Sequence, residues 1–436
     1  MSGELQVSMR IRRLAGVAVM VALTAAASFV GPVTTAATAG DTWLPKNGPF
    51  FNNPRGGVLE RYRIQRHLMD AIKHTHKGAV IRISLYSMDR IEVAKSLIAA
   101  RRRGVRVQIL INDHQVTRAQ RMLHHALGSN PRNRNFIHEC RHGCRAQDEN
   151  LHSKFYLFSQ TGAGTDVVFV GSANFTLNAV KWQWNDMFSV RGQHALFDRF
   201  VNLFNDMRHD YRRDQPSYTF CNAPAAYDCR WRRDDFFTWV FPKKVGPGND
   251  PVMDILRAVD CSWRTPDGEP RRTMLRLSMH TMRMSRGVYL AAKVRDLYAQ
   301  GCDIRVLYGL GSGRVKRAFG RPTARGKLPL RSTGFDVNDD GEIERYTHQK
   351  YLTIDGSWAG QERVQISFTG SSNWTGRGTT GDEIIFSVRG GDYLRAWNAN
   401  FRLMWDRYSR NAYTTSPSHY RGGYGDLRPG ATWEAD

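Results

Sequence analysis

A short polar pattern occurs twice in this chain, and its repetition limits the available folds more than any other feature. Each copy reads His-x-Lys and is followed about 20 residues later by Gly-Ser-x-Asn. The copies are His152-Ser153-Lys154 with Gly171-Ser172-Ala173-Asn174, and His348-Gln349-Lys350 with Gly370-Ser371-Ser372-Asn373. Two copies at like spacing indicate an internal duplication, so we expect two halves of similar fold.

The duplication extends into the segments that precede the motifs. In each half a strand is followed by an amphipathic helix that ends at a glycine, and then by a second strand. These elements are residues 81–88, 91–103 and 105–111 in the first half, and residues 275–282, 287–300 and 303–308 in the second. A repeated strand-helix-strand order predicts an α/β fold in which helices cover mixed, largely parallel sheets.

The motif residues suit the chemistry of a phosphodiester. In each copy the histidine and the lysine alternate along a predicted strand, so both side chains point to the same side. Of two histidines, one can be neutral and attack phosphorus while the other is protonated and acidic. Lysines neutralise the phosphate charge, and asparagine amides add directed donors. The predicted catalytic residues are His152, Lys154, Asn174, His348, Lys350 and Asn373, with Ser172 and Ser371 in support.

This doubled pattern resembles the signature of the phospholipase D superfamily, HxKxxxxD followed by GSxN. The second copy matches in full, with Asp355 at the acidic position, whereas the first copy has Ser159 there. The resemblance covers nearly the whole chain after residue 45. It implies two α/β halves around a pseudo-twofold axis, with one active site at their interface. It also implies that Glu383 orients a catalytic histidine, and the first copy offers Asn185 or Asp186 at that position.

The resemblance further implies a reaction through a phosphohistidine. It assigns the attack on phosphorus to His152 and the protonation of the leaving alcohol to His348, although the residues alone allow the two to be exchanged. The scheme requires no cofactor, because lysine and asparagine already neutralise the phosphate.

The net charge of +23 predicts a surface that attracts polyanions, such as an anionic membrane surface or nucleic acid. We favour a phospholipase that releases phosphatidic acid from phospholipid such as phosphatidylcholine. A metal-independent endonuclease is the alternative, and a polyanion-binding protein with an inactive site is a third hypothesis. No obligate protein partner is inferred.

The N-terminus predicts export. Three arginines precede the apolar run 14–23, and small residues follow up to Ala37-Thr38-Ala39, a suitable cleavage site. A membrane anchor is the alternative interpretation. We therefore predict a signal peptide at residues 1–39, halves at 40–220 and 246–413, a linker at 221–245, and a flexible tail at 414–436. The localisation expected is secreted.

Six cysteines in an exported chain favour disulfides. Proximity favours the pairs Cys140–Cys144, Cys221–Cys229 and Cys261–Cys302, among 15 connectivities that six cysteines allow. A zinc site near the first pair, with His138 and His142, is the alternative interpretation.

Two further features have an ordinary and a functional interpretation. Asp336, Asn338 and Asp340 begin a pattern typical of a calcium loop, but its twelfth position is Thr347 instead of glutamate, so an acidic turn is favoured. Three tryptophans near the Gly-Ser-x-Asn segments could line the site, although core packing is the commoner role: Trp182, Trp184 and Trp374.

Overall fold

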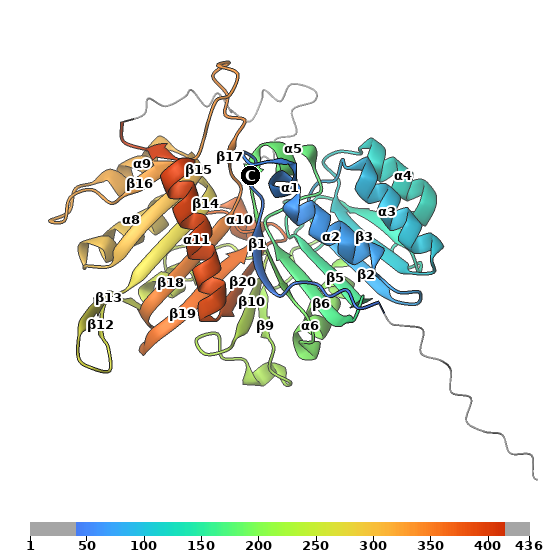
Figure 1. Ribbon diagram of the computed structural model, residues 1–436, viewed down its shortest axis with the longest axis horizontal. Coiled ribbons are helices and arrows are strands. Elements are labelled where there is room, and N and C mark those ends of the chain that lie inside the picture. The colour runs from blue at the N-terminus through green and yellow to red at the C-terminus, as the bar shows by residue number, and fades with distance from the viewer. Residues whose placement is uncertain (1–40, 415–436) are drawn as a thin grey trace, which may run out of the picture. The chain divides into compact units, whose positions relative to one another are not determined.

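Two mixed β-sheets with helices packed against them make up residues 41–414, which are the residues that the computed structural model describes (Figure 1). The predicted signal peptide at 1–39 lies outside the described residues, as does the predicted tail after Thr414. Within the described range, no helix has both the length and the apolar character that a membrane crossing requires.

The first sheet has seven strands. Their order is β1 (Gly48–Phe51), β8 (Asp186–Val190), β6 (Gly164–Gly171), β5 (Phe155–Thr161), β2 (Val80–Leu85), β3 (Arg106–Asn112) and β4 (Phe136–Cys140). The strands β2, β3 and β4 are parallel, and all the other neighbours are antiparallel.

The second sheet repeats this order. It runs β21 (Arg410–Asn411), β16 (Leu330–Ser332), β15 (Asp303–Gly311), β14 (Met274–Met282), β18 (Lys350–Trp358), β19 (Gln361–Gly370), β20 (Ile384–Arg389), β10 (Phe236–Val240) and β9 (Tyr218–Cys221), while β11 (Val259–Asp260) also pairs with β18. The strands β14, β15 and β16 are parallel, like β2, β3 and β4. The two motif strands β5 and β18 therefore occupy equivalent positions.

The mixed α/β fold and its duplication are confirmed, but the expectation of largely parallel sheets is wrong. Each motif strand follows a long loop and enters the sheet antiparallel to the first strand of its half, β2 or β14. It then turns directly into the strand that leads to Gly-Ser-x-Asn, β6 or β19, and short turns between neighbouring strands give antiparallel pairs.

Helices flank both sheets. In the first half they are α1 (Val58–Arg61), α2 (Arg63–Lys73), α3 (Ile91–Arg102), α4 (Arg118–Leu127), α5 (Leu177–Lys181) and α6 (His194–Met207). In the second half they are α7 (Pro251–Arg257), α8 (Met284–Ala299), α9 (Gly313–Gly320), α10 (Arg377–Thr380) and α11 (Gly391–Arg407). Helix α11, in red in Figure 1, packs on β18 and β19 and also contacts β1 of the first sheet.

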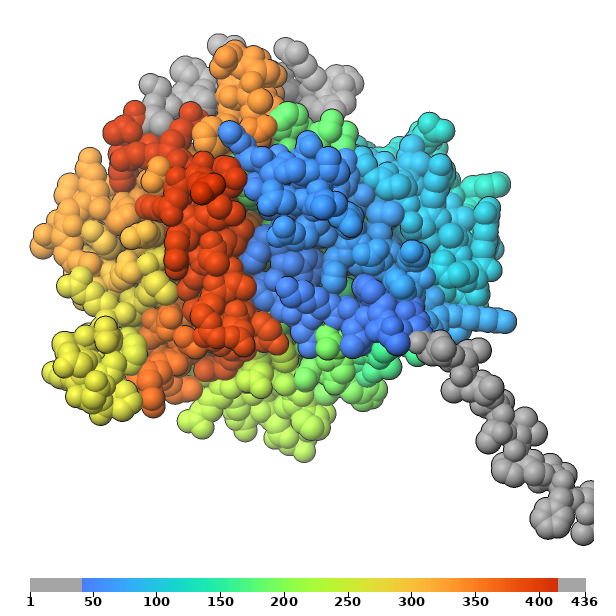
Figure 2. Space-filling view, viewed as in Figure 1, coloured from blue at the N-terminus to red at the C-terminus, as the bar shows by residue number. Residues whose placement is uncertain are grey.

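Both faces of each sheet are buried. Along β3, Ile109 and Ile111 pack in a core of the first half, whereas Leu110 packs in a core that both halves share. The shared core includes Leu307 of β15 and Tyr351 of β18. The halves are thus joined by a continuous apolar core, and Figure 2 shows the segments of α11 and the N-terminal region in direct surface contact.

Several features of the connection between the halves bear on the sequence predictions. The segment predicted as a linker, residues 221–245, contains β10, which pairs with β20 and β9.

All three expected disulfides are present: Cys140–Cys144, Cys221–Cys229 and Cys261–Cys302. Two small sheets complete the strands, β12 (Ser262–Arg264) with β13 (Pro270–Arg272), and β7 (Gln183–Trp184) with β17 (Tyr346–Thr347). The domain limits given above remain a prediction.

Candidate active site

Each motif histidine is held by backbone from the opposite half. The His348 amide donates to the Trp184 carbonyl at 2.8 Å, where β17 runs parallel to β7. The His152 amide donates to the Asp382 carbonyl at 3.1 Å, beside an equivalent bridge between Leu151 and Asp382. This reciprocal pairing places the two motifs face to face between the sheets.

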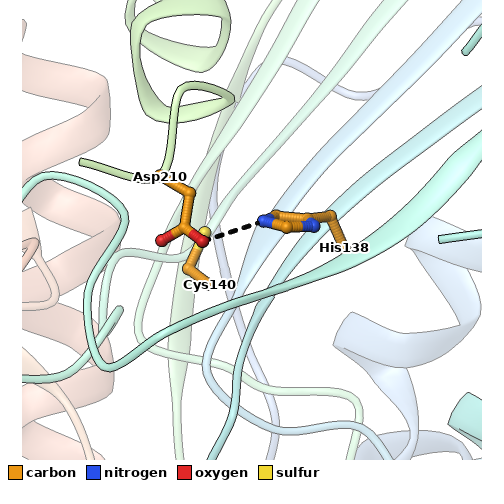
Figure 3. Close-up of side chains that lie close together, drawn as sticks. All are labelled: His138, Cys140 and Asp210. Atoms are coloured by element: carbon orange, nitrogen blue, oxygen red, sulfur yellow. Dashed lines mark hydrogen bonds and ion pairs between the residues drawn. The ribbon is translucent and has the colours of Figure 1, made fainter. Parts of the chain in front are cut away.

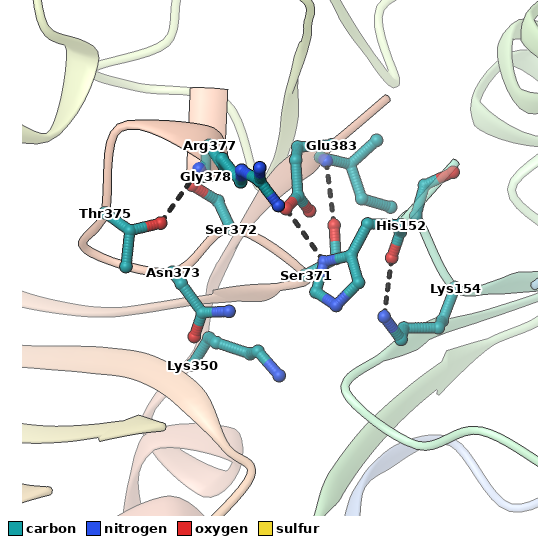
Figure 4. A network of polar contacts seen from close by, with 12 residues as sticks. His152, Lys154, Lys350, Ser371, Ser372, Asn373, Thr375, Arg377, Gly378 and Glu383 are labelled. Atoms are coloured by element: carbon teal, nitrogen blue, oxygen red, sulfur yellow. Dashed lines mark hydrogen bonds and ion pairs between the residues drawn. The ribbon is translucent and has the colours of Figure 1, made fainter. Parts of the chain in front are cut away.

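His152 has a carboxylate partner. Its Nδ1 lies 2.8 Å from Glu383 Oε1, and both side chains are almost completely buried. Lys154 extends beside it and donates from Nζ to the His152 carbonyl at 2.7 Å. Figure 4 shows the His152–Glu383 pair, with Lys154 on one side and Lys350 and Asn373 on the other. A carboxylate on Nδ1 fixes the tautomer and directs Nε2 away from it.

His348 has an amide partner instead. Its Nδ1 lies 2.8 Å from Asn185 Oδ1, and its Nε2 lies 2.8 Å from Lys350 Nζ. Burial, followed by the positive charge of Lys350, holds the pKa of His348 well below its usual range. These contacts therefore favour a neutral His348 with a hydrogen on Nδ1.

The asparagines of the two motifs take matching positions. Asn174 Oδ1 accepts from the Ser87 amide, and Asn373 Oδ1 accepts from the Thr281 amide, both at 3.3 Å. Each carboxamide oxygen is thereby held by the end of the first strand of its half. The amide nitrogen of Asn174 is buried and has no partner among the described residues, so it is available to an incoming oxygen.

The two serines support the shell behind the histidines. Ser172 Oγ donates to Asn185 Oδ1 at 3.0 Å and so steadies the partner of His348. Ser371 Oγ accepts from the Ile384 amide at 3.0 Å, next to Glu383.

The acidic position of the signature lies outside this cluster. Asp355 is in β18, where it pairs with Gln365 of β19. In the first half, Ser159 Oγ accepts from the Val80 amide at 2.9 Å, so the serine bonds the first strand of its half.

Two residues of the site, Tyr86 and His280, were not singled out from the sequence, and a third, Asn185, was one of two candidates. Asn185, not Asp186, faces His348, whereas Asp186 turns inward to accept from Thr369 and Trp397. Tyr86 lies edge-on to His152 at 5.3 Å between ring centroids, and His280 lies 4.6 Å from His348. The alignment of the strands 81–88 and 275–282 places Tyr86 and His280 at equivalent positions, and that was the available signal.

Neither alternative metal site belongs to this cluster. His138, Cys140 and Asp210 lie close together, and His138 Nε2 is 3.2 Å from Asp210 Oδ2 (Figure 3). The sulfur of Cys140 is bonded to Cys144, so it is not a thiolate ligand and the zinc interpretation does not hold.

In the loop that begins at Asp336, the carboxylates of Asp336, Asp340 and Glu344 lie close together. Thr347 is not part of this group, and its hydroxyl lies 3.0 Å from Ser278 Oγ. Asn338 bonds Asp340 within the same turn. These contacts describe an acidic turn, and a calcium ion there remains a prediction.

Two of the three tryptophans follow the commoner role. Trp184 and Trp374 are buried in the core, and Trp182 is partly exposed with Arg345 5.2 Å above its ring.

Comparison with known proteins identifies the family. The family model described as "Cardiolipin synthase, PLD-like domain" matches residues 68–208 and 272–405, which is more than half of the chain and one match in each half. No curated protein sequence matches the chain. The superfamily is generally metal-independent, and the histidines, lysines and asparagines of this site fit a reaction without a cofactor.

Two solved structures share the fold at low identity. Phosphatidylserine synthase from Haemophilus influenzae aligns with a TM-score of 0.54 and 12% identity, over 84% of this chain and 88% of that one. Polyphosphate kinase from Porphyromonas gingivalis aligns with a TM-score of 0.51 and 13% identity, over 85% of this chain and 53% of the kinase. The chain therefore spans about half the length of the kinase. The phospholipase D family member Nuc from Salmonella typhimurium is 22% identical over 38% of this chain and 99% of its own, with a TM-score of 0.27.

Proposed function

The chain belongs to the phospholipase D superfamily, and we propose that it is a secreted phosphodiesterase that hydrolyses phospholipid, for example phosphatidylcholine to phosphatidic acid and choline. Members of the superfamily are phosphodiesterases and phosphotransferases, so the reaction class is attack on a phosphodiester phosphorus. Three disulfides support export, because such bonds persist in oxidising compartments.

The unequal partners of the two histidines carry the mechanism. Glu383 stabilises a positive ring on His152, and the ring of a phosphohistidine that keeps its Nδ1 hydrogen is positive. Asn185 is neutral, so it stabilises a protonated His348 less and leaves it a stronger acid. We therefore assign the nucleophile to His152 and the general acid to His348.

The reaction then follows in two balanced steps. His152 Nε2 forms a bond to phosphorus while the bond to the alcohol oxygen breaks, and His348 gives its proton to that oxygen. His348, now neutral, takes a proton from water, whose oxygen attacks phosphorus and releases His152. Lys154, Lys350, Asn174 and Asn373 hold the phosphoryl oxygens in both steps.

Exposed apolar side chains beside the motifs favour a lipid. Met284 is 62% exposed and lies against Gly376, three residues after Asn373. Val116 is 46% exposed and follows His114, whose ring stacks on Tyr86 at 4.2 Å. An apolar residue thus borders each half of a cationic site, which suits an amphiphilic substrate at a membrane surface.

A nuclease is the second candidate function. Arg345 covers Trp182 and Arg55 covers Tyr408, at 5.2 and 5.9 Å from the ring centroids, close to where β7 pairs with β17. Arginine with aromatic side chains suits the phosphates and bases of a single strand. The net charge of +23 agrees with that partner as well.

A paired assay of purified protein without added metal tests the proposal. Choline release from phosphatidylcholine vesicles and nicking of plasmid DNA are measured side by side, with His152→Ala as the blank. Choline release that disappears in the variant supports the phospholipase. DNA nicking alone, falling steeply as salt rises, overturns it in favour of the nuclease.

A further inference from the structure

A buried imidazole that the two-histidine scheme does not use lies against His348. His280 of β14 is 1% exposed, and its ring stacks on Tyr346 at 5.0 Å with an interplanar angle of 13°. The His348 ring also lies close to it, with 4.6 Å between the two ring centroids and a tilt of 52°. His280 therefore contacts both the segment that crosses to the first half and the ring of His348.

The backbone keeps His280 in this position. Its amide donates to the Gln349 carbonyl at 2.8 Å, directly between His348 and Lys350. The neighbouring strand β15 contributes Gly309, where a Cβ would lie 2.6 Å from the Thr347 carbonyl and 3.0 Å from the His280 carbonyl. Only glycine allows β17 to approach β14 so closely, so no side chain of β15 separates the stacked rings.

The equivalent residue of the other half is chemically different. Tyr86 lies beside His152 as His280 lies beside His348, and Lys154 Nζ is 5.4 Å above the Tyr86 ring. A tyrosine does not change charge near neutral pH, whereas a histidine does. The groups that face the His280–His348 pair are Tyr346 of β17, Lys350 of β18, Asn185 beside β7, and His152 and Lys154 of the first motif.

We propose that His280 is a positioning residue that controls when His348 carries its proton, because the two rings form one buried pair that binds a single proton between them. This inference rests on the proposed function. Two positive rings at this distance repel each other, and Lys350 and Lys154 add to the repulsion. The anionic phosphate of the substrate draws the proton to His348, where the leaving oxygen takes it. Water returns it in the second step, so the pair ends with the proton count with which it began.

The low pKa of His348 agrees with this arrangement. Burial is its largest cause, Lys350 is the next, and His280 follows. Removal of the imidazole at position 280 should therefore let His348 hold its proton to higher pH.

The test compares two leaving groups in wild type, His280→Tyr and His280→Gln. Dihexanoylphosphatidylcholine releases choline and needs an acid, whereas bis-p-nitrophenyl phosphate releases a good leaving group and does not. In a plot of kcat/KM against pH, one limb should appear only with the choline ester, and that limb belongs to His348. In both variants we expect this limb to move to higher pH by roughly half a unit or more. Tyr86→Phe, the matched control in the other half, should leave it in place.

The outcomes separate the two proposals. If the limb does not move in either variant and p-nitrophenol release is intact, the proposed role of His280 is wrong. The phosphohistidine mechanism is not affected by that result. If the wild type releases no choline but nicks DNA, the lipid assignment fails, and the pH profile of nicking replaces that of choline release. If loss of activity is equal for both leaving groups, with no shift of a limb, His280 is only structural and the proposal is wrong.

Discussion

The two halves of this protein share a scaffold but not an electrostatic environment. On one side His152 has a carboxylate, Glu383, and a phenol, Tyr86. On the other side His348 has an amide, Asn185, and an imidazole, His280. Both histidines are buried at the same position before equivalent strands. The difference teaches that duplication supplies the geometry, and in the proposed mechanism the different partners divide the chemical work.

The largest expected effect comes from making the partners alike. In Glu383→Gln an amide replaces the carboxylate, so the positive ring of phosphorylated His152 is no longer stabilised. We expect kcat/KM to fall roughly 100-fold to 1000-fold for every leaving group. Steady-state assays with the choline ester and with bis-p-nitrophenyl phosphate measure it, and activity within threefold of wild type would contradict the role of Glu383.

The reverse exchange should act on the other histidine. Asn185→Asp places a carboxylate on Nδ1 of His348, which stabilises the imidazolium and raises its pKa. We expect the His348 ring to titrate at higher pH in NMR spectra of labelled protein. Activity should fall about tenfold, because the new charge opposes the phosphodiester. An unchanged titration would show that Asn185 does not govern His348.

A smaller effect is expected at the apolar residues beside the site. Met284→Asp should lower choline release from vesicles about tenfold, because burying a charge at a membrane surface is costly. Release from monomeric dihexanoylphosphatidylcholine should not change. Leu44→Asp is the control, because Leu44 is also exposed, at 45%, but lies away from the motifs. Its neighbour Trp43 accepts a hydrogen bond from the Ala163 amide, at the far end of β5. Equal losses in both variants would remove the argument for a lipid.

The backbone groups that hold the histidines also differ, and this difference predicts an effect on the pH dependence of stability. The Asp382 carboxylate accepts from the amides of Cys144 and Arg145, and burial raises its pKa to about 7. The folded protein thus binds this proton more tightly than the unfolded chain does. Its stability is highest below the unfolded pKa near 4 and falls as pH rises towards 7, by at most about 4 kcal/mol.

Asp382→Asn removes that dependence. When thermal unfolding of both proteins is measured between pH 4 and pH 8, the Tm of wild type should rise relative to that of the variant as pH falls. A constant difference in Tm across that range would mean that Asp382 is ionised throughout.

The sequence predicted the parts of this site that depend on local order. The His-x-Lys and Gly-Ser-x-Asn motifs, the duplication and the disulfides are all patterns of spacing. The partners of the histidines are different, because Glu383 and His152 are 231 residues apart and Asn185 and His348 are 163 apart. The resemblance indicated Glu383, but the choice between Asn185 and Asp186 depended on how the chain passes from β7, which pairs with β17 of the second half, into β8.

The strand directions were harder to predict for a related reason. Helices between strands suggested parallel sheets, and that holds for β2–β3–β4 and β14–β15–β16. The motif strands join by hairpins, and their pairing with β2 and β14 is set by the loops before His152 and His348. Those loops also carry the contacts that join the halves. The hydrophobic periodicity of a single segment does not predict such contacts.

The most direct test of the division of labour is to trap the intermediate. In His348→Asn, bis-p-nitrophenyl phosphate still has a good leaving group, but water is no longer activated. We predict a burst of p-nitrophenol equal to the enzyme concentration, and a p-nitrophenyl phosphoryl group on His152 in peptide mass spectra. The matched variant His152→Asn should give no burst. Phosphorylation of His348 in His152→Asn, or no covalent adduct in His348→Asn, would contradict the account.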